Sequence, residues 1–138
     1  MLKPQIDVFM GCDTPVEEAR TVLFGAPFAS TTPTRPGTRF GPAALRRESY
    51  GLELYSPYQD RDLSDTAVLD SGDLELSMGS SQLALADIQA RTAEILSAGK
   101  RPFLLGGEHL VTLGAFRAVY ERYPHVVILH LDAHADLR

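Results

Sequence analysis

Short apolar runs alternate along this chain with longer stretches of helical spacing. The apolar runs are rich in Val, Ile, Leu and Phe, which is typical of buried strands. They predict strands over residues 21–25, 66–69, 102–105 and 126–131. The last run is apolar except for His130, so we expect a strand that is covered on both faces of a sheet.

The stretches between these runs predict three helices. The clearest covers residues 81–98 and ends at Gly99, and a second covers residues 110–122. A shorter helix is predicted over residues 43–47, directly after a proline that suits the first helical turn. Residues 29–39 are rich in Ser, Thr, Pro and Gly, which indicates a loop.

Strands that alternate with helices indicate a parallel sheet with right-handed crossovers. The pattern alone therefore supports a parallel α/β fold. We find no repeat and no low-complexity linker, and divide the chain into an N-terminal segment, residues 1–20, and a domain region, residues 21–138. In such sheets ligands bind beyond the carboxyl ends of the strands, so chemistry is expected there.

Composition narrows the class of protein. The 138 residues are 44% hydrophobic and 22% charged, as in globular proteins, and the net charge of −5 comes without a basic cluster, which argues against nucleic-acid binding. No apolar run is long enough for a membrane span, and the N-terminus lacks a signal-peptide core. The single Cys12 fits a reducing cytoplasm; we interpret it as an incidental residue in a loose N-terminal segment.

Three candidate metal ligands follow the last apolar run. Asp132, His134 and Asp136 alternate with small or apolar residues and share one side of an extended backbone. Two carboxylates and an imidazole that converge repel one another unless a cation neutralises them. Oxygen ligands with imidazole and without thiolate suit Mn²⁺ better than structural zinc. The alternative is a surface turn, where Asp and His are also frequent.

A second candidate lies where residues 102–105 run into paired glycines followed by Glu108 and His109. His109 is a candidate ligand, although a histidine at a helix start is often a capping or surface residue. Glu108 is expected to support the site rather than to bind metal, or to interact favourably with the helix N-terminus. His130 shares strand parity with Asp132 and could line the site, but we favour a core position for it.

These motifs together resemble the ureohydrolase family, the binuclear manganese hydrolases that include arginase, agmatinase, guanidinobutyrase and formimidoylglutamase. The resemblance extends through residues 25–27, 35–42, 51–58 and 70–73, and is strongest to the agmatinase branch. It implies a three-layer α/β/α fold of the arginase type with a mainly parallel sheet, of which the chain holds a part. It also implies two Mn²⁺ per complete subunit.

The resemblance implies roles for individual residues. His109, Asp132, His134 and Asp136 match metal ligands of the family, with Asp132 bridging the two ions. Asp132 and Asp136 would be catalytic through a metal-bound hydroxide. The implied reaction converts agmatine and water to putrescine and urea, a step in polyamine biosynthesis. The implied partner is a small cationic guanidino substrate, and the implied assembly is a cytoplasmic homo-oligomer, a trimer or hexamer.

Two further features set the limits of this interpretation. In arginases the corresponding positions are Ile-Asn, and that asparagine helps to bind the substrate α-carboxylate. This chain has Leu137 and Arg138 there, which favours agmatine over arginine. Arg35, Arg39 and Arg46 could bind an anionic substrate, but we favour loop anchoring or subunit contacts for them, because guanidine substrates are cationic. Because the family's remaining ligands lie on a later strand, we expect the chain to be the N-terminal half of an enzyme and inactive alone.

Three alternatives to the agmatinase interpretation stay open. A guanidinobutyrase or another amidinohydrolase would share the motifs. A catalytically silent ureohydrolase-like module could serve as an oligomerisation or regulatory subunit. A mononuclear metal-binding domain without a hydrolytic role is the third.

Overall fold

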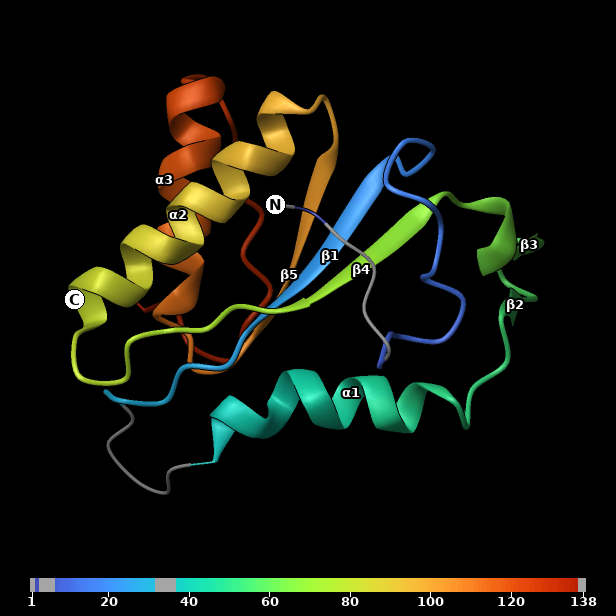
Figure 1. Cartoon of the computed structure of the whole chain (residues 1–138), viewed down its shortest axis with the longest axis horizontal. Helices are drawn as coiled ribbons and strands as arrows, with labels where there is room; N and C mark the ends of the chain where they lie inside the picture. The colour runs from blue at the N-terminus through green and yellow to red at the C-terminus, as the bar shows by residue number, and fades with distance from the viewer. Residues whose placement is uncertain (1, 3–6, 32–36, 137–138) are drawn as a thin grey trace.

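A three-stranded parallel sheet forms the centre of the computed structural model, which describes residues 2, 7–31 and 37–136 (Figure 1). Its strands are β1 (Thr21–Ala26), β4 (Val68–Asp73) and β5 (Arg101–Gly106), in the order β4-β1-β5. Both neighbours of β1 pair with it in parallel. A separate antiparallel pair, β2 (Tyr55–Ser56) and β3 (Arg61–Asp62), forms a small hairpin at one end of the molecule.

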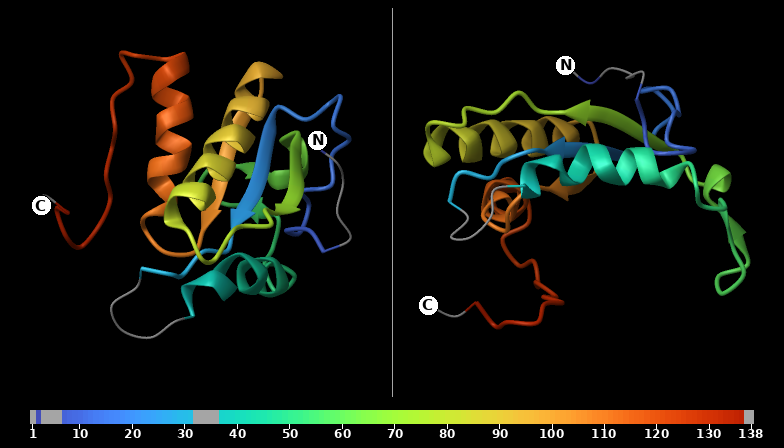
Figure 2. Two further views of the ribbon diagram at one scale, coloured as in Figure 1. Left: turned by 60° about the vertical axis from the view of Figure 1, so that its left-hand side comes forward. Right: turned by 90° about the horizontal axis from the view of Figure 1, so that it is seen from below.

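Helices cover the two faces of the sheet. Helix α1 (Gly41–Ser49) connects β1 to β4, and α2 (Ser81–Ser97) connects β4 to β5. The two connections run in opposite directions across the sheet, so right-handed crossovers place α1 and α2 on opposite faces, as Figures 1 and 2 show. Helix α3 (Val111–Arg122) packs beside α2. The layered α/β/α arrangement and the three helices predicted from the sequence are confirmed.

The hydrophobic core lies between β1 and the α2–α3 pair. Val22 and Phe24 of the central strand are fully buried, and Ile88 and Ile95 of α2 pack against them. Gly114 lets α3 approach α2 closely, because a Cβ there would lie 2.8 Å from the backbone oxygen of Leu85. Leu69 of β4 belongs to the same core cluster and the partly buried Leu104 of β5 packs against it, so the core includes residues of all three strands.

Local signals account for the helix ends. Pro42 stands in the first turn of α1, where its missing N–H is not needed. The side chain of Ser80 accepts a hydrogen bond from the backbone N–H of Leu83 and caps α2. Gly99, with φ +71°, follows the end of α2 and adopts a left-handed conformation that other residues avoid.

Strand β4 extends further than the sequence predicts. Residues 70–73 were expected to form a turn after a strand ending at Leu69, but they continue β4 as far as Asp73. Gly72 has φ +76°, and the pairing of β1 with β4 shifts register between Leu23 and Gly25. The strand tolerates Asp70 because its carboxylate is paired with a buried arginine, which sequence spacing does not reveal.

The strand predicted over residues 126–131 is not formed. This segment is irregular and lies beside α3, apart from the sheet, and no strand of the described residues pairs with it (Figure 2). Its apolar side chains are exposed, with Leu129 at 83% and Leu131 at 85%. The prediction was wrong for this structure because an apolar run becomes a strand only where neighbouring backbones offer hydrogen bonds and a covered face.

The N-terminal segment is packed rather than loose at Cys12. That residue is 3% exposed, and the neighbouring Asp13 forms an antiparallel bridge with Leu69. The backbone carbonyl of Cys12 accepts a hydrogen bond from the N–H of Asp70 at 2.7 Å. Burial, followed by the charges of Asp70 and Asp13, raises the pKa of the Cys12 thiol to about 11, which makes it an unreactive, protonated core group.

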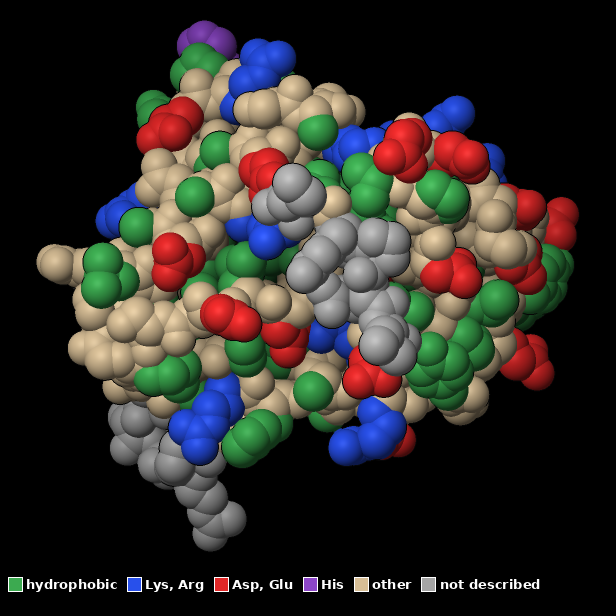
Figure 3. All heavy atoms as spheres, in the orientation of Figure 1, with side chains coloured by type: hydrophobic (Ala, Val, Ile, Leu, Met, Phe, Trp, Pro, Cys, Tyr) green, Lys and Arg blue, Asp and Glu red, His purple; other side chains and the backbone are tan. Residues whose placement is uncertain are grey.

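The molecular surface mixes charges of both signs. On the face shown in Figure 3, Asp and Glu side chains are interspersed with Lys and Arg. No helix within residues 2, 7–31 and 37–136 is long and apolar enough to cross a membrane.

Candidate metal centre

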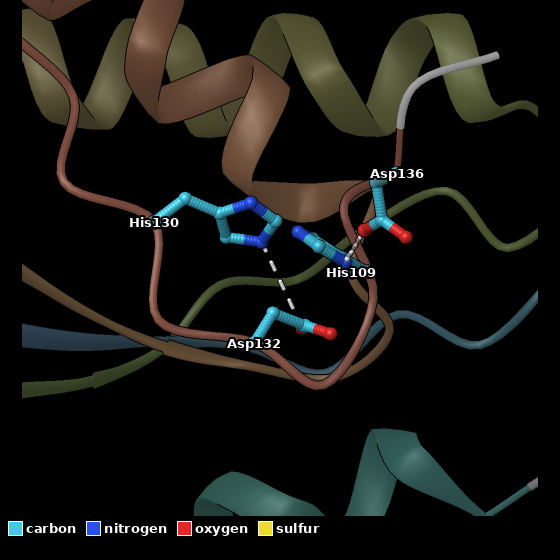
Figure 4. A group of neighbouring side chains, drawn as sticks. All are labelled: His109, His130, Asp132 and Asp136. Carbon is cyan, nitrogen blue, oxygen red and sulfur yellow. Dashed lines mark ion pairs between the residues drawn. The ribbon is translucent and has the colours of Figure 1, made fainter.

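Four side chains converge from two segments that are distant in sequence. His109 stands in the turn between β5 and α3, and His130, Asp132 and Asp136 belong to the segment after α3 (Figure 4). The turn follows the carboxyl end of β5, as expected for a ligand site in a parallel sheet. The later segment folds back along α3 and brings its two carboxylates to this turn.

The donor atoms of this four-residue cluster are close enough to share one ion. Nδ1 of His109 lies 2.8 Å from Oδ2 of Asp136, and Nε2 of His130 lies 3.8 Å from Oδ2 of Asp132. One potential ligand atom of each residue lies within 4.8 Å of all the others. Opposite ligands of an octahedral ion with bonds of about 2.1 Å are about 4.2 Å apart. The donor separations in the cluster, up to 4.8 Å, are comparable with this distance, so these four residues are candidates to hold a divalent cation.

The structure brings together three of the four ligands predicted from the sequence. His109, Asp132 and Asp136 lie in the cluster, whereas the side chain of His134 is 83% exposed and stands outside it. The Nδ1 of His134 lies 3.6 Å from Oδ1 of Asp132. Its backbone N–H donates to the same oxygen at 2.8 Å, so here His134 orients Asp132 through its main chain.

His130 occupies the fourth position, against the core position favoured from the sequence. Its side chain is 39% exposed, and its ring lies 5.6 Å from that of His109 between centroids. The core interpretation assumed a buried strand over residues 126–131, and it was wrong because that strand is absent. Strand parity with Asp132 was the sequence signal that indicated His130.

The cluster carries concentrated, solvent-accessible charge. The pKa of Asp132 is held below its ordinary value by the hydrogen bond from the backbone N–H of His134 and, further, by the nearby histidines His130, His109 and His134. Asp132 is therefore ionised at neutral pH and suited to bind a cation. Hard carboxylate oxygens beside imidazole nitrogens match Mn²⁺ and related divalent ions.

The turn that carries His109 is joined to the loop after β1. Glu108 is 6% exposed, and its carboxylate accepts hydrogen bonds from the backbone N–H of Thr31 at 3.0 Å and from the hydroxyl of Thr31 at 2.5 Å. Glu108 was expected to support the site, and Thr31 is the residue that its carboxylate contacts. Sequence reasoning did not single out Thr31, because nothing local in a Ser/Thr-rich loop shows which hydroxyl faces a distant carboxylate.

A separate concavity lies on the α1 side of the molecule. It has a volume of about 690 Å³ and is lined by Asp7, Val8, Ala43, Arg46, Arg47, Tyr50, Gly72 and Asp73. None of the four cluster residues lines it. Arg46 is the anchor that the sequence suggested, whereas Arg39 packs over the ring of Phe40, 4.9 Å from its centroid.

The remaining sequence candidates fall outside the described residues. Arg35, which was interpreted as an anchor, is one of them. Leu137 and Arg138, which bear on the choice between agmatine and arginine, are the others.

Comparison with known proteins identifies the family. The sequence profile of the Arginase family matches residues 19–138. An agmatinase from Bacillus subtilis is 47% identical over 131 residues, which cover 95% of this chain and 45% of that protein. The chain belongs to the arginase family, and it spans about half the length of the relatives that it matches.

Solved structures show the same fold. A protein from Clostridium difficile superposes with a TM-score of 0.87 at 49% identity, covering 90% of this chain and 45% of that one. Proclavaminate amidino hydrolase from Streptomyces clavuligerus gives a TM-score of 0.84 at 31% identity, with 96% and 45% covered. A Trypanosoma cruzi formiminoglutamase variant solved with Mn²⁺ gives 0.70 at 26% identity, with 80% and 38% covered. The arginase-type α/β fold is therefore established for this chain.

Proposed function

We propose that the protein is a manganese-dependent ureohydrolase that hydrolyses agmatine to putrescine and urea. The observation that carries this proposal is the convergence of His109, Asp132 and Asp136 beyond the carboxyl end of β5. By the resemblance described in the sequence analysis, these residues would correspond to metal ligands of the ureohydrolases, and the chain belongs to the arginase family. The Bacillus subtilis relative, an agmatinase, supports the choice of substrate.

The metal would be held by the carboxylates of Asp132 and Asp136 and by the imidazole of His109. Either His130, which lies in the cluster, or His134, which matches the family motif, would complete the set. We propose Mn²⁺ because the donors are oxygen and imidazole, and because a structural neighbour is solved with that ion. When bound, the metal supplies Lewis acidity for attack on a guanidino carbon.

The residues at positions 137 and 138 bear on the choice of substrate. Arginine differs from agmatine by an α-carboxylate, which needs a polar partner in a desolvated pocket. Leu137 and Arg138 stand where arginases have Ile-Asn, so we propose that agmatine is preferred.

A chimera with a full-length agmatinase would test this proposal. In the chimera this chain replaces the matching 131 residues of the Bacillus subtilis agmatinase, and urea release from agmatine, arginine and 4-guanidinobutyrate is measured with Mn²⁺. We expect agmatine to have the highest kcat/KM, and Asp132→Asn to abolish turnover. Equal turnover of arginine would contradict the substrate, and full activity of Asp132→Asn would contradict the role of the cluster.

One alternative substrate class has support of its own. The neighbour from Streptomyces clavuligerus is an amidino hydrolase that acts on proclavaminate, so the fold accommodates other amidino compounds. A clear preference of the chimera for 4-guanidinobutyrate would keep the chemistry and change the substrate. A chimera that binds Mn²⁺ and releases no urea would instead favour a silent regulatory or oligomerisation module.

A further inference from the structure

The turn after β5 and the loop after β1 are connected by a ladder of hydrogen bonds. The N–H of Gly107 donates to the carbonyl of Ala26, and the N–H of Glu108 donates to the carbonyl of Phe28, both at 2.9 Å. These bonds continue the pairing of β1 with β5 beyond its last strand partners, Ala26 and Gly106. The backbone on either side of His109 is thus fixed to the chain beyond β1.

Close contact makes this connection rigid. A Cβ on Gly107 would lie 2.1 Å from the backbone oxygen of Phe28 and 2.7 Å from its nitrogen, so only glycine fits. Phe28 is itself buried in the core at 1% exposure. The turn therefore rests on a fixed backbone, and its position is set before any ligand binds.

Glu108 completes the connection with a buried charge. Both carboxylate oxygens of Glu108 accept hydrogen bonds from Thr31. The backbone N–H of Thr31 donates to one oxygen and its hydroxyl donates to the other. A buried carboxylate requires such partners, since an unpaired one is costly. The next residue, His109, has a side chain that is 55% exposed and faces the cluster. In this turn Glu108 contacts Thr31, while the neighbouring His109 is directed towards the cluster.

We infer that Glu108 and Thr31 are a positioning pair for the metal centre. Glu108 holds Thr31 through hydrogen bonds and does not bind the ion, and this contact fixes the orientation from which His109 reaches the cluster. Partners that orient a ligand in this way typically change metal affinity 10- to 100-fold when they are lost, by order of magnitude. The inference rests on the proposed function in one respect, that the cluster binds a metal. The hydrogen bonds between Glu108 and Thr31 are present in the structure without a metal.

The test compares four variants of the 138-residue chain by titration with Mn²⁺. Glu108→Ala removes both acceptors, and Thr31→Val removes the hydroxyl donor; we expect each to weaken binding by roughly tenfold or more. Glu108→Gln and Thr31→Ser should bind within about threefold of the unmodified chain. A glutamine can accept from the Thr31 N–H and donate to its hydroxyl, so it keeps the contact without the charge.

Two controls separate positioning from other effects. Glu53→Gln alters an exposed carboxylate between α1 and β2 and should leave affinity unchanged. Ile95→Val lowers stability through the core, where Ile95 is fully buried, and should also leave affinity unchanged while the chain is folded. Unchanged affinity in Thr31→Val, or a loss in Glu108→Gln as large as in Glu108→Ala, would overturn the inference.

Amide hydrogen exchange supplies a readout that does not depend on the metal. The amides of Gly107 and Glu108 should be protected in the unmodified chain and should exchange at least about tenfold faster in Glu108→Ala, but not in Glu108→Gln. A chain that binds no Mn²⁺ yet shows this pattern would retain the Glu108–Thr31 contact but contradict its role in metal binding by this chain, whereas urea release from the chimera tests the proposed function separately. Amides that are equally unprotected in all variants would contradict the positioning pair itself.

Discussion

The guanidinium of Arg46 holds the carboxylate of Asp70 through two hydrogen bonds, from Nε at 2.7 Å and from Nη2 at 2.9 Å. Asp70 is fully buried and also accepts from the backbone N–H groups of Phe9 and Gly72. Burial by itself would lower the pKa of Arg46, but its hydrogen bonds with Asp70 and Asp73 raise that pKa above its ordinary value. This ion pair fastens α1 to β4.

We predict that Arg46→Met destabilises the fold by about 3–5 kcal/mol, because it leaves the buried Asp70 carboxylate without its cation. Urea unfolding followed by circular dichroism measures the change. Arg47→Met is the matched control: Arg47 pairs with Glu48, and both side chains are about three-quarters exposed, so the loss should stay below about 0.5 kcal/mol. Similar losses in the two variants would contradict the anchoring role of Arg46.

Gly107→Ala should destabilise the fold by about 1–3 kcal/mol or more, since the new methyl group would overlap the backbone of Phe28. Gly79→Ala provides the comparison, because among the described residues no atom beyond the chain neighbours of Gly79 lies within 4 Å of the Cβ position there. Thermal melts of both variants suffice. If both substitutions lowered the melting temperature equally, the close approach at Gly107 would not be what fixes the turn.

Stability at alkaline pH should depend on Cys12. Its thiol has a pKa raised from 9.0 to about 11 in the fold, so its contribution is complete below pH 9 and is lost as the pH rises towards 11. In that window the folding equilibrium constant should fall by up to about tenfold per pH unit. Cys12→Ala should show a flatter profile than the unmodified chain between pH 9 and 11; parallel profiles would contradict the assignment.

Charges placed in the irregular segment should improve solubility without a loss of stability. Val127 and Leu129 are 89% and 83% exposed, so Val127→Lys and Leu129→Lys should change the unfolding free energy by less than about 0.5 kcal/mol. Light scattering should show slower aggregation, because an exposed apolar run is removed. A cooperative loss of structure in either variant would mean that the segment is packed.

Local sequence signals predicted most of the fold. The proline in α1, the serine cap of α2 and Gly99 each act within one or two turns of helix, so their effect can be seen in the sequence. Strand β4 was underestimated, because its Asp-Ser-Gly-Asp residues are typical of turns while their burial depends on Arg46, which lies on another element. Residues 126–131 were misjudged because strand formation depends on neighbours that sequence periodicity does not specify.

In the candidate site, too, local patterns were predicted correctly and features that depend on the path of the backbone were not. Ligand types and alternation identified Asp132 and Asp136, the resemblance to the ureohydrolases singled out His109, and the structure brings the three together. The places of His130 and His134 depend on the path of the backbone after residue 131, and an alternating pattern assumes an extended path. Residues 133 and 134 form a bend and Asp136 has φ +51°, so the path is not extended.

The most direct test of the metal centre is titration of Mn²⁺ into the folded chain, followed by electron paramagnetic resonance of the free ion. Asp132→Asn removes an ionised ligand from the cluster, and Asp87→Asn, on an exposed position of α2, is its control. We predict saturable binding that Asp87→Asn preserves and that Asp132→Asn and His109→Ala weaken by about tenfold or more. Binding of equal affinity in all four proteins would contradict a metal centre built on His109 and Asp132.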